Sequence, residues 1–276
     1  MNNHRRALRG LLTAMLVSSI PATLILLSGS LSHAALIAHY NGEEAASPIV
    51  DQAGGQTAAA TDTGHIYSTA GPAGFGNSIG LNGNGSWQLS AGDSAELNLA
   101  NNFTVAAWVY IDSATQAGKT GVSANNHRII GDDAAWDADG WSFGVTNGIM
   151  RFTRNGIIDA DDGSGTAIPL DQWVHLAATP TSTGIDFYLN GSLTGSNANG
   201  ANNNTGLGNN GVMDPYAIGR SYGNGQEQWF PGQLDEIRVY DTVLTQSEIA
   251  GLMIPEPGSA ALLGLGVLGF LARRRR

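Results

Sequence analysis

The chain lacks cysteine entirely and is poor in charged residues, which make up 13% of its 276 residues. Without cysteine it forms no disulfides, thiolate zinc sites, iron–sulfur clusters or cysteine nucleophiles. Basic residues are also scarce in its body, because residues 35–254 contain six basic and 22 acidic residues, a net charge of −16. A body this acidic repels phosphate backbones, so we expect no nucleic-acid binding.

The first 34 residues predict a secretory signal peptide. Three arginines lie within the first nine residues, and an apolar stretch runs from Leu11 to Leu27. Small residues precede the predicted cleavage site between Ala34 and Ala35, so signal peptidase is an expected partner. The alternative is a single N-terminal membrane anchor, since the apolar stretch is long enough to form one.

The C-terminal residues 255–276 combine three features in a fixed order. Pro255-Glu256-Pro257 precedes 13 residues without a polar side chain, and an arginine cluster ends the chain. The apolar run is shorter than the about 20 residues of a full membrane span, and arginines favour the cytoplasmic side. The two prolines keep the chain extended and accessible to a protease. The cluster consists of Arg273, Arg274, Arg275 and Arg276.

This arrangement resembles the PEP-CTERM sorting signal of Gram-negative bacteria over residues 254–276. In that family a membrane-embedded exosortase processes the protein near the Pro-Glu-Pro motif, and the product goes to the cell surface or the exopolysaccharide matrix. The resemblance implies export, an exosortase as partner, and transient anchoring in the inner membrane by a short C-terminal helix. It also implies a final location at the cell surface or in a biofilm matrix. The alternative is an ordinary C-terminal anchor.

Residues 35–254 predict one all-β domain. Short apolar strands are separated by glycine and asparagine, as is typical of a sandwich or barrel. The strand 103–111 is largely apolar on both faces, so we expect it to be central and covered on both sides. A capping box formed by Thr245 and Glu248 predicts a single short helix that runs to about Met253. The low-complexity stretch 195–211 predicts a long mobile loop. The other predicted strands are residues 35–40, 86–89, 128–130, 141–145, 149–153, 173–178, 185–189 and 233–240.

Four motifs of this body resemble the laminin-G-like (LamG) jelly roll of concanavalin A-like proteins. In chain order they are Asn102–Tyr110, Gln172–Ala177, Asp186–Gly191 and Phe230–Tyr240. The resemblance implies a sandwich of two antiparallel sheets closed by one short C-terminal helix. Many members bridge two cysteines, which this chain does not have. We expect non-catalytic binding, of carbohydrate such as exopolysaccharide or of another surface molecule.

The residue pattern for glycan cleavage is missing. Laminarinase-like enzymes on the same sandwich carry two glutamates on one strand, one as nucleophile and one as acid. None of the six glutamates in residues 35–254 shows that spacing, and the sequence contains no H-E-x-x-H. We therefore expect no enzyme. A glycan-cleaving enzyme and a purely structural matrix component stay open as alternatives, because the fold alone does not decide between them.

A structural Ca²⁺ is implied by the LamG resemblance. In that family the aspartate that opens the last strand, here Asp235, commonly helps to hold the ion. Glu43 and the glycine-rich loop 81–85 are the expected counterparts of the remaining ligands, and Ca²⁺ takes carboxylate and carbonyl oxygens. The alternative is that Asp235 caps a turn.

A ligand site is predicted around Trp136, with Asp137 and Asp139 beside it. An aromatic ring stacks on the C–H groups of a sugar while neighbouring polar atoms orient its hydroxyls. The other five tryptophans fit core positions. They are Trp87, Trp108, Trp141, Trp173 and Trp229.

Overall fold

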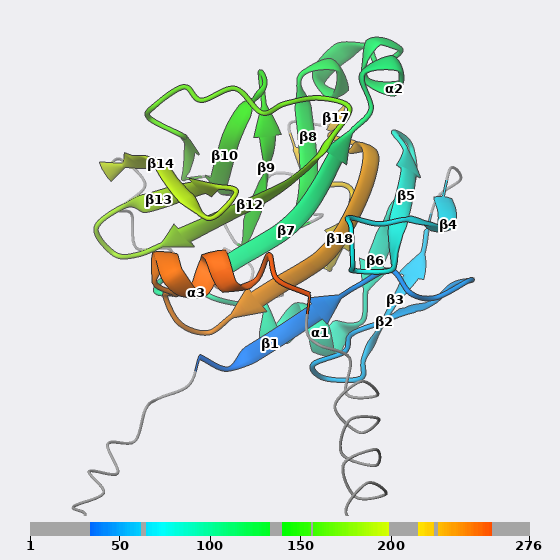
Figure 1. The fold of residues 1–276 in the computed structure, drawn as a ribbon, viewed down its shortest axis with the longest axis horizontal. Coiled ribbons are helices and arrows are strands. Elements are labelled where there is room, and N and C mark those ends of the chain that lie inside the picture. The colour runs from blue at the N-terminus through cyan, green and yellow to red at the C-terminus, as the bar shows by residue number, and fades with distance from the viewer. Residues whose placement is uncertain are drawn as a thin grey trace, which may run out of the picture. The chain divides into compact units, whose positions relative to one another are not determined.

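Two eight-stranded antiparallel sheets, A and B, form the sandwich in the computed structural model (Figure 1). The structure describes residues 34–61, 65–132, 140–155, 157–198, 215–223 and 226–255. In sheet A the strand order is β14 (Ser192–Asn197), β13 (Ile185–Leu189), β12 (Trp173–Pro180), β7 (Thr104–Ile111), β18 (Pro231–Tyr240), β5 (Asn77–Asn82) and β4 (His65–Ala70), and β1 (Leu36–Tyr40) also pairs with β18.

Sheet B is built mostly from the middle of the chain. Its strand order is β11 (Ile158–Asp161), β10 (Ile149–Arg154), β9 (Trp141–Thr146), β8 (Asn126–Asp132), β15 (Tyr216–Ile218), β6 (Trp87–Leu89), β3 (Thr57–Ala60) and β2 (Ile49–Val50). A separate two-stranded ribbon pairs β16 (Tyr222–Gly223) with β17 (Gln226–Glu227). The predicted all-β sandwich is confirmed.

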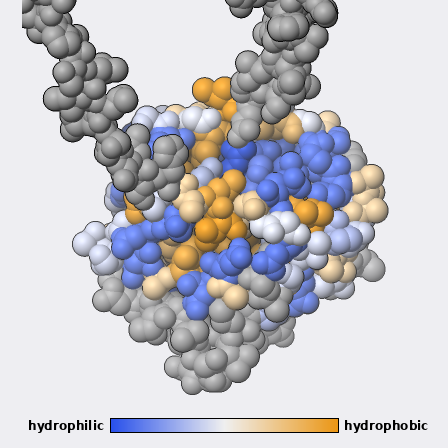
Figure 2. All heavy atoms as spheres, turned by 90° about the horizontal axis from the view of Figure 1, so that it is seen from below, coloured by the Kyte–Doolittle hydropathy of each residue, from blue (hydrophilic) through white to orange (hydrophobic). Residues whose placement is uncertain are grey.

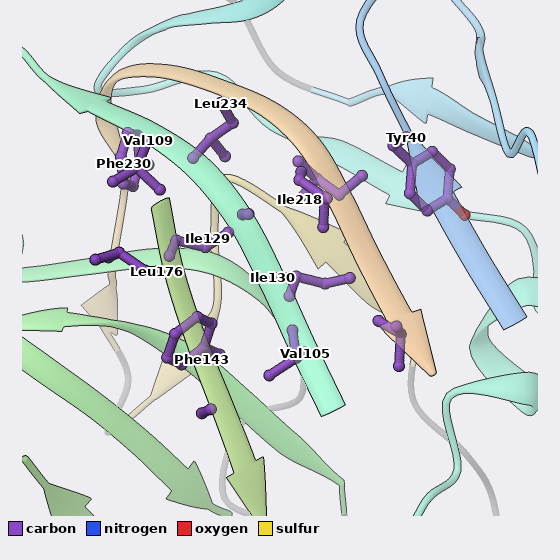
Figure 3. Close-up of a cluster of buried hydrophobic side chains, with 14 of the residues drawn as sticks. Tyr40, Val105, Val109, Ile129, Ile130, Phe143, Leu176, Ile218, Phe230 and Leu234 are labelled. Carbon is purple, nitrogen blue, oxygen red and sulfur yellow. The ribbon is translucent and has the colours of Figure 1, made fainter. Parts of the chain in front are cut away.

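The core lies between the two sheets and follows the alternation of the strands. On β7, which lies between β12 and β18, Val105 and Val109 face the interior. Phe143 and Ile130 face them from sheet B (Figure 3). Fully burying a side chain of this size contributes about 1.5–3 kcal/mol. The strand order confirms the predicted central place of β7 in its sheet. The burial of its side chains is a main source of the fold's stability.

The predicted helix is α3 (Gln246–Gly251), and its capping box forms as expected. Thr245 Oγ1 accepts a hydrogen bond from Glu248 N, and the Glu248 side chain accepts one from Thr245 N. Ile249 packs on the outer face of sheet A against Ala106 and Ala177. The structure adds three short elements to this helix. They are α1 (Ala91–Glu96), α2 (Ser113–Ala117) and the 3-10 helix η1 (Gly121–Ala124).

Part of the predicted loop 195–211 forms a strand, and other predicted segments lie outside the described residues. Gly195 and Asn197, expected in a loop, belong to β14, and residues 199–211 of that predicted loop lie outside the described ranges. The predicted signal peptide through residue 33 and the apolar run 260–272 also lie outside them. Within the described ranges no helix is long and apolar enough to cross a membrane. Seen from the end that carries β1 and α1, the surface shows a hydrophobic area among hydrophilic side chains (Figure 2).

Candidate functional site

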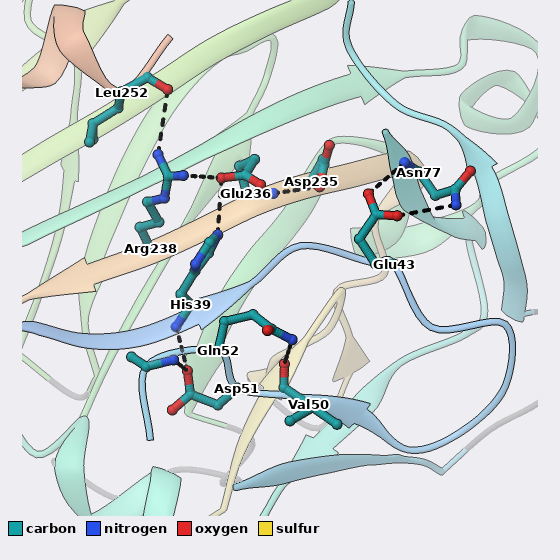
Figure 4. A network of polar contacts seen from close by, with 11 residues as sticks. His39, Glu43, Val50, Asp51, Gln52, Asn77, Asp235, Glu236, Arg238 and Leu252 are labelled. Carbon is teal, nitrogen blue, oxygen red and sulfur yellow. Dashed lines mark hydrogen bonds and ion pairs between the residues drawn. The ribbon is translucent and has the colours of Figure 1, made fainter. Parts of the chain in front are cut away.

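Strand β18 changes its neighbour halfway along one edge, and the predicted Asp235 lies at this junction. The first half of β18 pairs with β5 and the second half with β1. On the other edge the register with β7 shifts between Asp235 and Arg238, and Glu236 takes a φ of 51°. A positive φ is uncommon for a residue with a side chain, and such strain gathers at functional sites. The start of β5 and the loop after β1 both reach this junction (Figure 4).

The carboxyl group of Asp235 is fully buried and only half satisfied. Its Oδ1 accepts a hydrogen bond from Glu236 N at 2.8 Å, whereas Oδ2 has no hydrogen-bond partner in the described part of the chain. Burial raises the pKa of Asp235 to about 9, and the negative charges of Glu236 and Glu43 add to this effect. A buried carboxyl group with an unpaired oxygen and a raised pKa is a candidate cation ligand.

Glu43 is held next to this junction by the start of β5. Its Oε1 accepts a hydrogen bond from Asn77 N at 2.8 Å, and its Oε2 accepts one from Asn77 Nδ2 at 3.3 Å. Two glycines make the close approach possible. A Cβ on Gly71 would lie 2.8 Å from Asp235 Oδ2, and a Cβ on Gly76, whose φ is +90°, would collide with Glu43 Oε1.

The oxygens around this junction fit the predicted Ca²⁺. The position of the missing Gly71 Cβ is also 3.0 Å from Gly76 O and 3.2 Å from Asn77 O, so carbonyl and carboxylate oxygens surround one small space. Such a mixture suits Ca²⁺. Among the residues that the structure describes, no three His, Cys, Asp or Glu side chains form a metal cluster. A cation between Asp235 and Glu43 would therefore take its other ligands from the main chain.

The loop that supplies these carbonyls is 71–77, whereas the sequence pointed to loop 81–85. In the latter loop Gly83 O accepts a hydrogen bond from Lys119 Nζ at 2.6 Å. Its neighbours Leu81 and Asn82 belong to β5 and pair with β18. Carbonyl ligands leave no side-chain pattern in a sequence, and the closely spaced Gly71 and Gly76 were the available signal.

An ion network that sequence reasoning missed surrounds Glu236. Its Oε2 contacts His39 Nε2 at 3.0 Å and forms an ion pair with Arg238 Nη2 (Figure 4). Arg238 Nη1 also donates to Leu252 O at 3.5 Å. The network joins β1, β18 and the end of α3, so Glu236 is engaged in holding the junction together and leaves Asp235 and Glu43 as the candidate cation ligands.

The remaining predicted site residues are only partly described. Trp136, Asp137 and Asp139 lie outside the described ranges. Ala34 packs against the cluster that contains Ile249, and Ala35 N donates to an Asp241 carboxylate oxygen at 2.9 Å. Pro255 lies next to Gly74, where a Cβ would be 2.7 Å from Pro255 Cγ. The other sorting residues, Glu256, Pro257, Arg273, Arg274, Arg275 and Arg276, lie outside the described ranges.

A row of side chains crosses the outer face of sheet A; we call Trp173, Tyr110, Gln233 and Ile66 the aromatic row. Trp173, Tyr110 and Gln233 are register partners, and Gly80 connects them to Ile66. The two ring centroids are 5.8 Å apart and both rings are half-buried, while Ile66 is 49% exposed. Gln233 Oε1 accepts from a serine hydroxyl at 3.0 Å. Half-exposed rings beside an amide suit the stacking and hydrogen bonding of a sugar.

A second aromatic pair lies one step along the same face. Trp108 is in T-shaped contact with His175 at 5.5 Å and is 5.8 Å from Phe75. Burial lowers the pKa of His175 to about 3, so this ring is neutral and packs rather than exchanges protons at neutral pH. The prediction that Trp108 and Trp173 belong to the core is wrong, because both are half-buried on the outer face. Trp87 and Trp141 lie in the core as predicted.

The carboxylates on the outer edge of sheet B are engaged in ion pairs. Arg151 Nε contacts Asp161 Oδ1 at 2.5 Å, and Arg151 Nη1 contacts Asp159 Oδ2 at 2.9 Å. These bonds raise the pKa of Arg151, the hydrogen bond to Asp161 above all. One guanidinium thus engages both carboxylates, whereas glycoside hydrolysis needs two carboxyl groups in separate roles.

Family models match two parts of the chain. The model of the concanavalin A-like lectin/glucanases superfamily, Laminin_G_3, matches residues 81–250. The model of the PEP-CTERM protein-sorting motif matches residues 254–276. None of the curated proteins matches the chain significantly in sequence.

Solved structures share the fold at low sequence identity. Domain 4 of AbnA, a GH43 extracellular arabinanase from Geobacillus stearothermophilus in complex with arabinotriose, is 23% identical with a TM-score of 0.58, over 80% of this chain and 99% of that one. The binding domain of botulinum neurotoxin DC in complex with SialylT is 16% identical with a TM-score of 0.53, over 79% of this chain and 50% of that one. The chain thus spans about half the length of the toxin domain, and these likenesses show the fold.

Proposed function

Because the chain belongs to the concanavalin A-like lectin/glucanase superfamily and ends in a PEP-CTERM sorting motif, we propose that it is an exported surface protein whose domain binds a glycan without cleaving it. The proposal makes residues 35–254 the working domain. Signal peptidase cuts between Ala34 and Ala35, and an exosortase processes the chain near Pro255 and Glu256. The product then leaves its transient inner-membrane anchor for the cell surface or the extracellular matrix.

The aromatic row is the observation that carries the binding proposal. Its rings lie on strands of the rigid sheet rather than on loops, so they are held in place before a ligand arrives. α3 packs against Ala106 and Ala177, which lie four positions from Tyr110 on β7 and from Trp173 on β12. A sugar that stacks on Trp173 would meet Gln233 two strands away, within the width of a short oligosaccharide.

Two further observations support a glycan as ligand. The solved AbnA domain holds arabinotriose on the same fold, and the toxin binding domain holds SialylT. Asp159 and Asp161 on the outer edge of sheet B are both bound by Arg151, which does not fit the two separate roles of glycosidase carboxylates. This arrangement supports binding without cleavage.

We also propose that Ca²⁺ stabilises the domain at Asp235 and Glu43. When bound there, the ion would neutralise the buried carboxyl group of Asp235 and the exposed carboxylate of Glu43, whose negative charge acts on Asp235. The unpaired Oδ2 of Asp235 and the carbonyls of Gly76 and Asn77 are the oxygens available to it. The site joins β18, β5 and the loop after β1, so its role is to hold the junction of sheet A together.

A binding screen with the full-length chain tests the proposed function. The chain is applied to a glycan array, and each bound glycan is then incubated with it and assayed for new reducing ends. We expect binding without new reducing ends, and we expect Trp173→Ala to weaken it. Leu193→Ala is the control, because Leu193 is 49% exposed on β14, away from the aromatic row. New reducing ends would identify an enzyme, and an empty array would favour a structural matrix component.

A further inference from the structure

Arg128, on the outer face of β8, is a buried cation without a carboxylate partner in the described part of the chain. It is 3% exposed, and its Nε donates to Gln228 Oε1 at 2.6 Å. Its Nη1 has no hydrogen-bond partner among the described residues. The acidic groups whose charge reaches it, Asp159 and Asp161, form their ion pairs with Arg151.

Such a group is costly to keep unless something neutralises it. Burial lowers the pKa of Arg128 to about 10, so the guanidinium is still protonated at neutral pH. Buried charges are normally paired, and a buried charge without its partner destabilises a fold strongly. The body holds 22 acidic residues, yet none that the structure describes pairs with Arg128. An anionic ligand would supply what is missing.

Two more buried polar atoms without partners lie beside Arg128. Asn126 and Thr146 are register partners on β8 and β9. They lie two residues along these strands from the pair of Arg128 and Gly144. Asn126 Oδ1 and Thr146 Oγ1 have no hydrogen-bond partner among the described residues. Val145, between Gly144 and Thr146, faces the core, so these side chains share the outer face of sheet B. An amide oxygen and a hydroxyl at this spacing suit the hydroxyl groups of a sugar.

The charge of the whole body narrows the class of anion. With a net charge of −16 over residues 35–254, the domain repels dense polyanions such as nucleic acids. A single guanidinium matches one planar carboxylate. We propose that Arg128, with Asn126 and Thr146, binds the carboxylate and hydroxyls of an isolated uronic acid unit in an otherwise neutral glycan. This inference rests on the proposed glycan binding and adds a second, buried site on sheet B, whereas the aromatic row lies on sheet A.

The test compares two oligosaccharides that differ in one carboxylate. Xylotriose bearing a single glucuronic acid and plain xylotriose are titrated calorimetrically into the full-length chain. We expect the acidic sugar to bind at least about tenfold more tightly, the contribution of a hydrogen bond to a charged group. Because a buried pair is screened little by salt, this ratio should persist at high ionic strength. Equal affinity for the two sugars, or binding of neither, would overturn the proposal.

Variants separate a binding role from a structural one. Arg128→Met removes the charge at similar volume, so it should abolish the preference for the acidic sugar while Tm stays the same or rises. Arg220→Met, which removes a positive charge that stacks on Trp229, is the matched control and should keep the preference. A large fall in Tm of Arg128→Met with the preference intact would overturn the proposal. Trp173→Ala should leave the acidic preference unchanged, so failure of the aromatic row is distinguishable from failure of this site.

Discussion

The interior of the sandwich and its outer faces are built on opposite principles. Between the sheets, large apolar side chains such as Phe143 and Val109 are fully buried, and the strands' alternation alone places them there. On the outer faces the structure holds half-exposed rings at Trp173 and Tyr110. It also holds buried polar atoms, such as Asp235 Oδ2, that have no hydrogen-bond partner among the described residues. The difference teaches that the interior carries stability, whereas the outer faces retain unmet contacts that a ligand or ion would complete.

The largest expected effect is the loss of folding stability on substitution of a core side chain. Phe143→Ala removes a fully buried ring from the core and should lower the free energy of unfolding by about 3–5 kcal/mol. Chemical denaturation of the full-length chain measures this change. Ile157→Ala, at a side chain that is 39% exposed, is the control and should stay within about 0.5 kcal/mol of the parent. A small effect of Phe143→Ala would mean that the core is not where the stability lies.

Removal of calcium is the next largest effect. A ligand present at 100 times its Kd stabilises the folded state by about 2.7 kcal/mol, so EDTA should lower the Tm of the wild-type chain. Asp235→Asn removes the charged ligand and should abolish this response. Glu96→Gln changes an exposed carboxylate on α1 and should leave the response intact. If EDTA does not change the Tm of the wild-type chain, the proposed Ca²⁺ site at Asp235 and Glu43 is wrong.

The pH dependence of stability in the calcium-free chain is a second test of the buried Asp235. The pKa of Asp235 is raised to about 9 in the folded state from 3.8, so the folded state binds the proton more tightly than the unfolded chain. Its contribution to stability is full below pH 3.8 and is lost as the pH rises towards 9. In EDTA, we expect wild-type stability to fall between pH 5 and 9 relative to Asp235→Asn. Added Ca²⁺ should reverse this trend, because the ion binds the ionised carboxylate. If the stabilities of the wild-type chain and of Asp235→Asn change in parallel with pH in EDTA, Asp235 is not a buried group that keeps its proton.

The aromatic row should affect binding but not folding. Trp173→Ala truncates a half-exposed ring and should weaken glycan binding by about 1–3 kcal/mol, the range of a binding hot spot. Its Tm should change little, because Trp173 is not part of the main core. Calorimetric titration and thermal unfolding of the same samples measure both quantities. A large loss of Tm with unchanged affinity would show that Trp173 stabilises the fold and does not bind the glycan.

The smallest expected effect concerns the cap of α3. Thr245→Ala removes the side chain that accepts from Glu248 N and should cost about 1 kcal/mol of stability. Because α3 packs against Ala106 and Ala177, four positions along their strands from Tyr110 and Trp173, glycan affinity should not change. Thr183→Ala, at an exposed turn, provides the control.

Much of the sandwich was readable in the sequence, because burial imposes alternation. Strand 104–111 and the helix after Thr245 followed from apolar spacing and a capping box. Short strands such as β2 and β17, with two residues each, carry too few positions for any period. The sequence favoured the interior for Trp173, because alternation does not tell which of two apolar faces meets the other sheet.

The candidate site was readable only in part. Asp235 and Glu43 were named through the family resemblance, and the structure places both at the β18 junction. Loop 71–77 was missed because the oxygens it brings to the junction are main-chain carbonyls, which leave no side-chain pattern. Arg128 was missed because its burial depends on contacts between β8 and residues 100 positions away, such as Gln228.

The most direct test of the central claim follows the indole N–H signals of the six tryptophans by NMR during titration with a glycan found in the array screen. Single Trp→Phe variants assign the signals. We expect the Trp173 signal to shift with glycan concentration, while those of Trp87 and Trp141 in the core stay in place. Shifts confined to core tryptophans, or a Trp173 signal that does not move while glycan binds, would contradict binding at the outer face of sheet A.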